Sequence, residues 1–86
     1  MAKEKGYIGV RIHYHDVEQA AVEFDGLARL AKQFNAVSLP NRANSSTVPL
    51  QFRTAEHRRG FYDTLLDRWK QGKSQFHHGE FVPSYA

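Results

Sequence analysis

The chain has 86 residues, no cysteine and a formal net charge of +3, with 41% hydrophobic and 24% charged residues. This length suits a single domain over residues 1–86, and the apolar content is too high for an intrinsically disordered chain. The missing cysteines exclude disulfide frameworks and thiolate metal sites, and no run of about 20 apolar residues could span a membrane.

Residues 7–15 predict a half-buried strand, because apolar and polar side chains alternate along them. The side chains expected to face the core are Ile8, Val10, Ile12 and Tyr14. Nothing in this stretch protects its edge, so a dimer could form there if the strand is not central in its sheet.

His13 and His15 share one face of this strand, and Asp16 follows them directly. Two imidazoles at this spacing can bind one metal ion, but a site needs three or four ligands. Asp16 is better placed as a helix cap, because it forms a capping box with Gln19. Further ligands would have to come from His57, His77 or His78, which no spacing brings together. We therefore favour solvent-facing histidines over a metal site, and expect binding through this face to depend on pH.

The first helix is expected to begin at Asp16 and end at Asn35. Apolar side chains between these residues recur at i, i+3, i+4 and i+7 and form one continuous stripe. Arg29 and Lys32 lie near the end of the helix, where the helix dipole favours positive charge.

Two further strands are expected at 36–39 and 47–53, separated by a turn-rich loop at 40–46. Pro49 cannot donate to a ladder of hydrogen bonds. It therefore places its strand at a sheet edge, or at least leaves one side of residue 49 unpaired.

Thr54 is expected to cap a second helix over residues 55–71, which Gly72 ends. Residues 1–6 and 73–86 are expected to be terminal arms. The second arm could dock as an extended segment or a short strand through its apolar side chains, which are Phe76, Phe81, Val82 and Tyr85.

These elements predict an α+β two-layer sandwich with β-α-β-β-α order, in which two helices cover one face of a three-stranded sheet. The predicted core is Val10, Ile12, Phe24, Leu27, Phe34, Leu50, Phe52, Phe61, Leu65 and Trp69. The other face is expected to stay open, and its side chains are Arg11, His13, His15, Gln51 and Arg53, with Tyr7 at the margin.

The sequence carries no recognised catalytic motif. It has neither a Gly-x-Ser-x-Gly elbow nor a glycine-rich phosphate loop, because its glycines are scattered. Glu56 and His57 lie in the expected first turn of the second helix, where an anion could bind and the two side chains could serve as a catalytic pair. The simpler interpretation is that Glu56 complements the helix dipole. We therefore expect a non-catalytic protein without cofactor or metal, and keep a small metal-dependent enzyme as the remote alternative.

The second half of the chain is rich in arginine, which binds carboxylates and phosphates with a planar fork and is enriched at interface hot spots. The predicted partner-binding residues are Arg11, Arg42, Arg53, Arg58, Arg59 and Arg68. The competing interpretation is that these side chains only solubilise the helix and pair locally, for example Arg59 with Asp63. If the arginine prediction fails, the aromatic tail becomes the expected contact surface.

The sequence favours a small binding module that occupies the surface of a macromolecular partner, as an inhibitor or adaptor, and the partner surface is expected to be acidic. Phage and mobile-element accessory proteins such as anti-CRISPR proteins are similar in size and in lacking a catalytic motif, which is an analogy only. The alternative is a nucleic-acid-binding domain that uses the basic helix flank, and salt dependence separates the two. We expect a cytoplasmic protein, because the N-terminus lacks the apolar run of a signal peptide.

Overall fold

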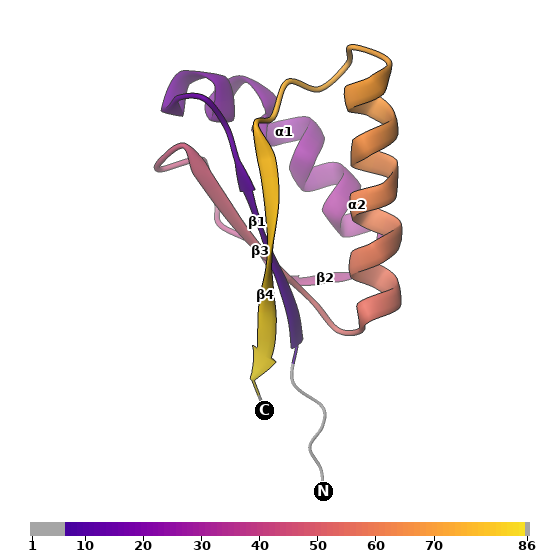
Figure 1. Ribbon diagram of the computed structural model, residues 1–86. Coiled ribbons are helices and arrows are strands. Elements are labelled where there is room, and N and C mark those ends of the chain that lie inside the picture. Colours follow the sequence, from indigo (N-terminus) through magenta and orange to yellow (C-terminus); the bar gives the residue numbers. More distant parts are fainter. Residues whose placement is uncertain (1–6, 86) are drawn as a thin grey trace, which may run out of the picture.

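The computed structural model describes residues 7–85 and contains two helices and one four-stranded antiparallel sheet (Figure 1). The elements in chain order are β1 (Tyr7–His13), α1 (Val17–Gln33), β2 (Ala36–Ser38), β3 (Thr47–Phe52), α2 (Ala55–Lys70) and β4 (His78–Tyr85). The strand order in the sheet is β2-β3-β1-β4. The side chains of Tyr7, Pro83, Ser84 and Tyr85 lie outside the described part of the structure, as do residues 1–6 and 86.

Both helices begin at the predicted capping residues. The Asp16 carboxylate accepts a hydrogen bond from the Gln19 amide at 2.8 Å, and the Thr54 hydroxyl accepts one from the His57 amide at 3.1 Å. These bonds satisfy amides that have no partner within the first turn of a helix. At the other ends, Asn35 has a φ of 62° and Gly72 a φ of 76°. Left-handed backbone at these two residues ends each helix, as the sequence predicts.

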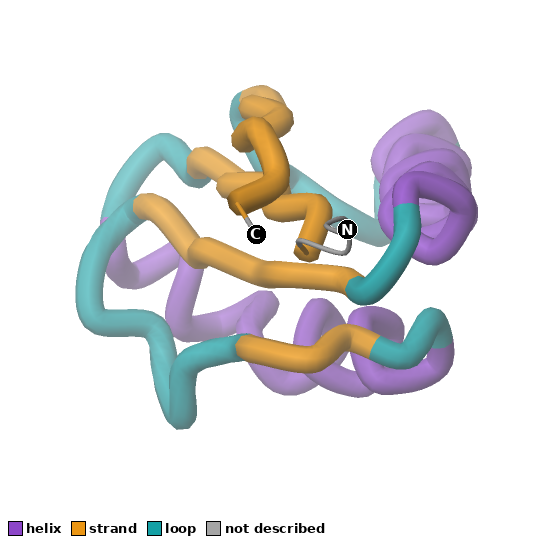
Figure 2. The backbone as a smooth tube through the Cα atoms, turned by 90° about the horizontal axis from the view of Figure 1, so that it is seen from below, coloured by secondary structure: helices purple, strands orange, loops and turns teal. Residues whose placement is uncertain are grey.

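One hydrophobic cluster joins both helices to a single face of the sheet. Val10 and Ile12 of β1 are at most 1% exposed, and Phe52 and Phe61 are fully buried. In Figure 2, α1 lies along the β2–β3 half of the sheet, and α2 lies along the half that contains β1 and β4. The prediction that two helices cover one face of a sheet is therefore confirmed.

The predicted core is wrong at Trp69, which is 50% exposed. Trp69 lies at the border of the buried stripe of α2, where its ring is 6.4 Å from that of Phe76. Phe76 is only 4% exposed and belongs to the core, where the sequence did not predict it. Phe34 is partly buried and packs against the edge of the cluster.

The prediction of a three-stranded sheet was also wrong, because residues 78–85 of the expected tail form β4. This strand pairs with β1 in antiparallel register, with His78 opposite His13 and Phe81 opposite Val10. β1 is consequently an interior strand, with β3 on its other side. β1 therefore offers no free edge to a dimer, and the edge strands of the sheet are β2 and β4.

β3 is an interior strand in the sheet order, and Pro49 is tolerated in it because no neighbouring strand pairs with the outer side of residue 49. Pro49 lies opposite Arg11 of β1. β2 reaches β3 only at Phe52 and Gln51, so it stops short of residue 49. The outer side of residue 49 therefore needs no ladder hydrogen bond, which is the second of the two outcomes that the sequence predicted.

Candidate binding surface on the open sheet face

The face of the sheet that the helices leave uncovered is polar. Pro49 and Gln51 of β3 and Arg11 of β1 are exposed on it. β4 adds Glu80, whose Oε1 is 3.8 Å from the Arg11 guanidinium. The open face predicted from β1 and β3 is thus extended by β4, a strand that the sequence pattern does not predict.

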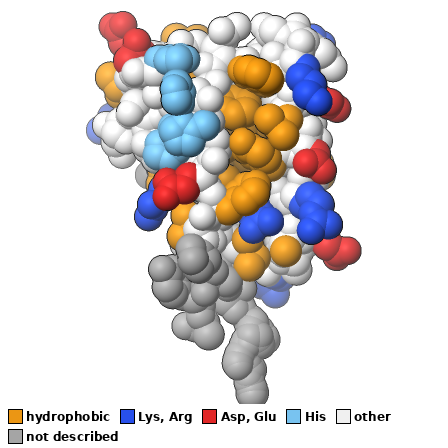
Figure 3. Space-filling model, viewed as in Figure 1, with side chains coloured by type: hydrophobic (Ala, Val, Ile, Leu, Met, Phe, Trp, Pro, Cys, Tyr) orange, Lys and Arg blue, Asp and Glu red, His pale blue; other side chains and the backbone are white. Residues whose placement is uncertain are grey.

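Four of the five histidines gather at one end of this face and form a cluster, defined as His13, His15, His77 and His78. The rings of His13 and His78 stack with centroids 4.3 Å apart, and those of His15 and His77 meet edge to face at 4.9 Å. Figure 3 shows the histidines as one continuous patch. The cluster forms because His78 lies opposite His13 across the β1–β4 ladder.

Hydrogen bonds fix the tautomer of His13. Its Nε2 lies 3.0 Å from Glu80 Oε1, and its Nδ1 lies 2.9 Å from the Thr47 hydroxyl. A neutral ring with hydrogen on Nε2 donates to the carboxylate and accepts from the hydroxyl, which satisfies both nitrogens. Nδ1 of His77 and Nδ1 of His78 are 2.6 Å apart, so one must donate to the other. Both rings cannot carry hydrogen on these nitrogens without breaking the contact.

The side chains of the cluster do not converge in the way that metal ligands do. Within residues 7–85, no group of three or more histidine, aspartate or glutamate side chains converges on a position that could hold a metal ion. Asp16 is engaged in capping α1, as the sequence analysis proposed. Local electrostatics instead affect protonation: loss of hydration, followed by the proximity of His13 and His77, lowers the pKa of His78, while Glu80 acts in the opposite direction.

Arg11 and Arg42 meet at a hollow on the open face, although they lie 31 positions apart in the sequence. The hollow has a volume of about 330 Å³ and is also lined by Pro49, Thr47 and Asn44. The loop 40–46 folds towards the sheet here, and Arg42 Nε donates to the Asn44 side chain at 3.3 Å. Of the six predicted arginines, these two line the same depression on the uncovered sheet.

The other predicted arginines lie on different surfaces. The Arg58 guanidinium stacks on Phe81, 4.1 Å from the ring centroid, and Arg59 is exposed on the outer side of α2. Arg53 is exposed after the end of β3. Arg68 points to a second hollow, between α1 and α2. The six side chains therefore do not form one continuous basic patch.

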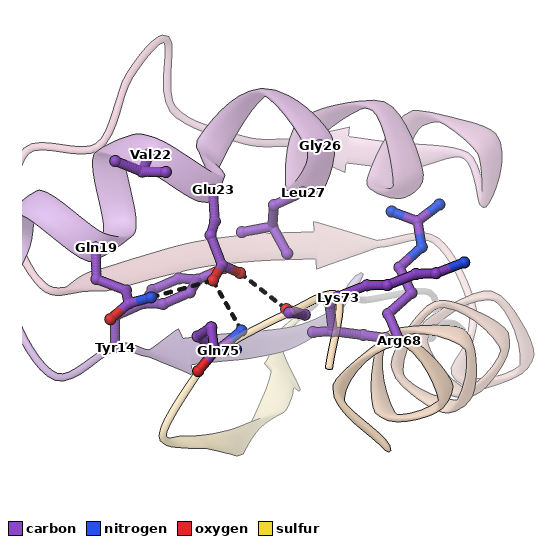
Figure 4. A pocket seen from close by; sticks show the side chains of 11 residues that line it. Tyr14, Gln19, Val22, Glu23, Gly26, Leu27, Arg68, Lys73 and Gln75 are labelled. Atoms are coloured by element: carbon purple, nitrogen blue, oxygen red, sulfur yellow. Dashed lines mark hydrogen bonds between the residues drawn. The ribbon is translucent and has the colours of Figure 1, made fainter. Parts of the chain in front are cut away.

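The second hollow, with a volume of about 420 Å³, is built around Glu23 (Figure 4). The Glu23 carboxylate accepts hydrogen bonds from the Ser74 hydroxyl at 2.8 Å and from the Gln75 amide at 2.7 Å. These bonds tie the segment between α2 and β4 to α1. Because they occupy the carboxylate, Glu23 has a structural role in directing the chain into β4.

The alternative catalytic pair gains no support from its geometry. Glu56 is exposed in the first turn of α2, and the His57 backbone amide serves the Thr54 cap. Among the described residues, no hydrogen bond links the Glu56 and His57 side chains. An acid–base pair would need such a bond or a shared substrate position.

No protein family, curated protein or solved structure matches this chain. In the described part of the chain, neither helix is long and apolar enough to cross a membrane.

Proposed function

We propose that this protein is a non-catalytic binding module that covers an acidic surface of a partner protein, as an inhibitor or adaptor, through its open sheet face. The observation that carries this proposal is the convergence of Arg11 and Arg42 on one hollow of a sheet face that no helix covers. A sheet is a rigid platform, and arginine forks on it bind carboxylates in pairs of hydrogen bonds.

The charges on this face favour a protein partner over nucleic acid. Glu80 lies on the edge strand of this face, 3.8 Å from Arg11, and would repel a phosphate backbone. Nucleic-acid grooves collect positive charge along one track. A protein surface can match arginine and glutamate side by side, because it carries both signs of charge.

A matched pair of charge reversals tests the proposal. The Arg11→Glu/Arg42→Glu variant reverses the two arginines at the hollow. The Arg29→Glu/Lys32→Glu variant makes the same change in net charge on exposed positions of α1. Tagged wild-type protein and both variants would be used to recover partners from the source cells, with circular dichroism as the check on folding.

We expect one protein to be recovered by the wild type and the α1 variant and lost with the Arg11→Glu/Arg42→Glu variant. Equal recovery by all three proteins would contradict a contact at the hollow. Recovery of nucleic acid whose affinity falls linearly with the logarithm of salt concentration would replace the proposal with the nucleic-acid alternative.

A further inference from the structure

β4 is an edge strand whose outer hydrogen-bonding groups are unpaired within residues 7–85. The Tyr14 amide donates to the Ser46 carbonyl at 2.7 Å, so even-numbered residues of β1 bond to β3 and odd-numbered ones to β4. The odd-numbered residues of β1 lie opposite His78, Glu80 and Val82, so the backbone groups of these three residues of β4 point towards β1. The amide and carbonyl groups of Gly79 and Phe81 consequently point outwards, where a further strand could add.

An apolar surface lies directly beside this edge. It is the aromatic strip, defined as Tyr62, Trp69 and Phe81, which packs on the buried ring of Phe76; neighbouring ring centroids in this group are 5.1–6.4 Å apart. Trp69 and Phe81 are each 50% exposed. Figure 3 looks onto this side of the molecule and shows the apolar strip running parallel to β4, with charged side chains of both signs beyond it. A partner strand on the edge would also cover the strip.

We propose that a second copy of this chain occupies this edge, by antiparallel pairing of β4 with β4 about a two-fold axis at Glu80. This register sets Gly79 of one copy opposite Phe81 of the other, on both sides of the axis. Four backbone hydrogen bonds form, two for each Gly79–Phe81 pair. The half-exposed Phe81 ring then lies across from a residue that has no side chain, an arrangement that protects glycine in sheets.

Two charged side chains of α2 are placed so that the same two-fold axis would bring opposite charges together. Tyr62 lies against Gly79 and stacks edge to face on Phe81, so this part of the helix is level with Glu80. Arg59 and Asp63 lie on either side of that level, and both are exposed. Within the described residues no ion pair joins them to each other. A two-fold axis runs the two α2 helices antiparallel, which brings Arg59 of each copy towards Asp63 of the other.

The pairing has one electrostatic cost, because it brings the two Glu80 side chains together at the axis. Each carboxylate keeps its own His13 hydrogen bond and its neighbouring Arg11. The buried aromatic strip and the backbone hydrogen bonds offset this repulsion. The product is one continuous sheet with four strands from each copy, in which both open faces lie on the same side.

The first experiment measures mass by sedimentation equilibrium over micromolar to millimolar concentrations, on wild-type protein and on synthetic protein with N-methyl-phenylalanine at position 81. N-methylation removes the outward amide of residue 81 and keeps the ring. We expect the wild type to approach twice its 9.9 kDa mass and the N-methyl protein to stay at 9.9 kDa with an unchanged circular dichroism spectrum. A wild type that is monomeric throughout, or an N-methyl protein that associates equally well, would overturn the proposal.

The aromatic strip is tested by Trp69→Glu, with Val37→Glu as its control. Val37 is 41% exposed and lies on β2, at the opposite edge of the sheet. We expect Trp69→Glu to weaken association at least about tenfold and Val37→Glu to leave it unchanged. The reverse pattern would locate association at the β2 edge and refute a β4 dimer.

The two-fold register is tested by mixing Arg59→Glu protein with Asp63→Arg protein. Each variant alone faces like charges across the axis. A mixed dimer instead pairs the introduced glutamate with the introduced arginine, and the native Arg59 of one copy with the native Asp63 of the other. Contacts within each chain are the same in both kinds of dimer, so only contacts between chains can favour mixing. We expect mixed dimers to exceed the statistical share, with association about tenfold tighter than for either variant alone. A statistical mixture would refute this register.

Discussion

The two sides of β4 are held in place by different chemistry. Towards the open face, the strand meets β1 through His78 and Glu80, which are exposed and hydrogen-bonded or stacked on His13. Towards α2, Gly79 and Phe81 meet the ring of Tyr62. Exposed polar contacts contribute little net stability and respond to pH, whereas buried apolar contacts contribute more and do not. The aromatic side should therefore hold the strand, and the histidine side should modulate it.

The largest effect is expected from removing the anchor of the aromatic side. Phe76 is 4% exposed and lies just before β4, with its ring 6.1 Å from Tyr62. Phe76→Ala should lower the free energy of unfolding by about 3–5 kcal/mol, because it leaves a cavity as well as losing burial. Urea unfolding at one fixed protein concentration measures this. A loss below about 1 kcal/mol would mean that the aromatic side does not hold β4.

A smaller effect is expected at Gly79. A Cβ added there would overlap the Tyr62 ring, so the ring must move off the strand. Gly79→Ala should cost about 1–3 kcal/mol by overpacking. The matched control is Gly26→Ala, where an added Cβ meets nothing within 4 Å in the middle of α1. That control should stabilise the protein by about 1 kcal/mol, because alanine is the better helix former. Equal effects of the two changes would refute close packing between Tyr62 and β4.

The same contrast explains which parts of the fold the sequence predicts. Asp16 and Thr54 cap their helices through residues three positions away, so local patterns suffice to find them. β4 is defined by pairing with β1, about 70 positions earlier, and Gly79 and Pro83 make it resemble a loop. The cluster of four histidines depends on the same distant pairing, and the hollow at Arg11 and Arg42 depends on the pairing of β1 with β3 and on the path of the loop 40–46. The histidine cluster can be predicted only after the alternation of His78, Glu80 and Val82 is interpreted as a strand, and the hollow only after β1 and β3 are paired.

Truncating histidine side chains on the polar side should lower the free energy of unfolding by less than either substitution on the aromatic side. The His13→Ala/His15→Ala variant removes one hydrogen bond to Glu80 and one to Thr47, while His15 is exposed. The expected loss is about 1 kcal/mol, because one hydrogen bond is exposed and the other only partly buried, so water can replace both. Thermal denaturation at pH 8, where histidine is neutral, measures this. A loss as large as that of Phe76→Ala would reverse the assignment of the two sides.

The smallest expected effect is the pH dependence of the histidine cluster. The pKa of His78 is lower in the folded protein than its ordinary value of 6.5, chiefly through loss of hydration and then through His13 and His77. The unfolded chain therefore binds more protons than the folded one around this pH, and stability must fall as pH falls through about 6.5. The short contact between the Nδ1 atoms of His77 and His78 is lost when both rings are charged, which acts in the same direction. Melting temperatures between pH 8 and pH 5 should decrease for the wild type and decrease less for His78→Gln. If His78→Gln leaves the profile as steep as that of the wild type, the polar side of β4 is not the modulating one.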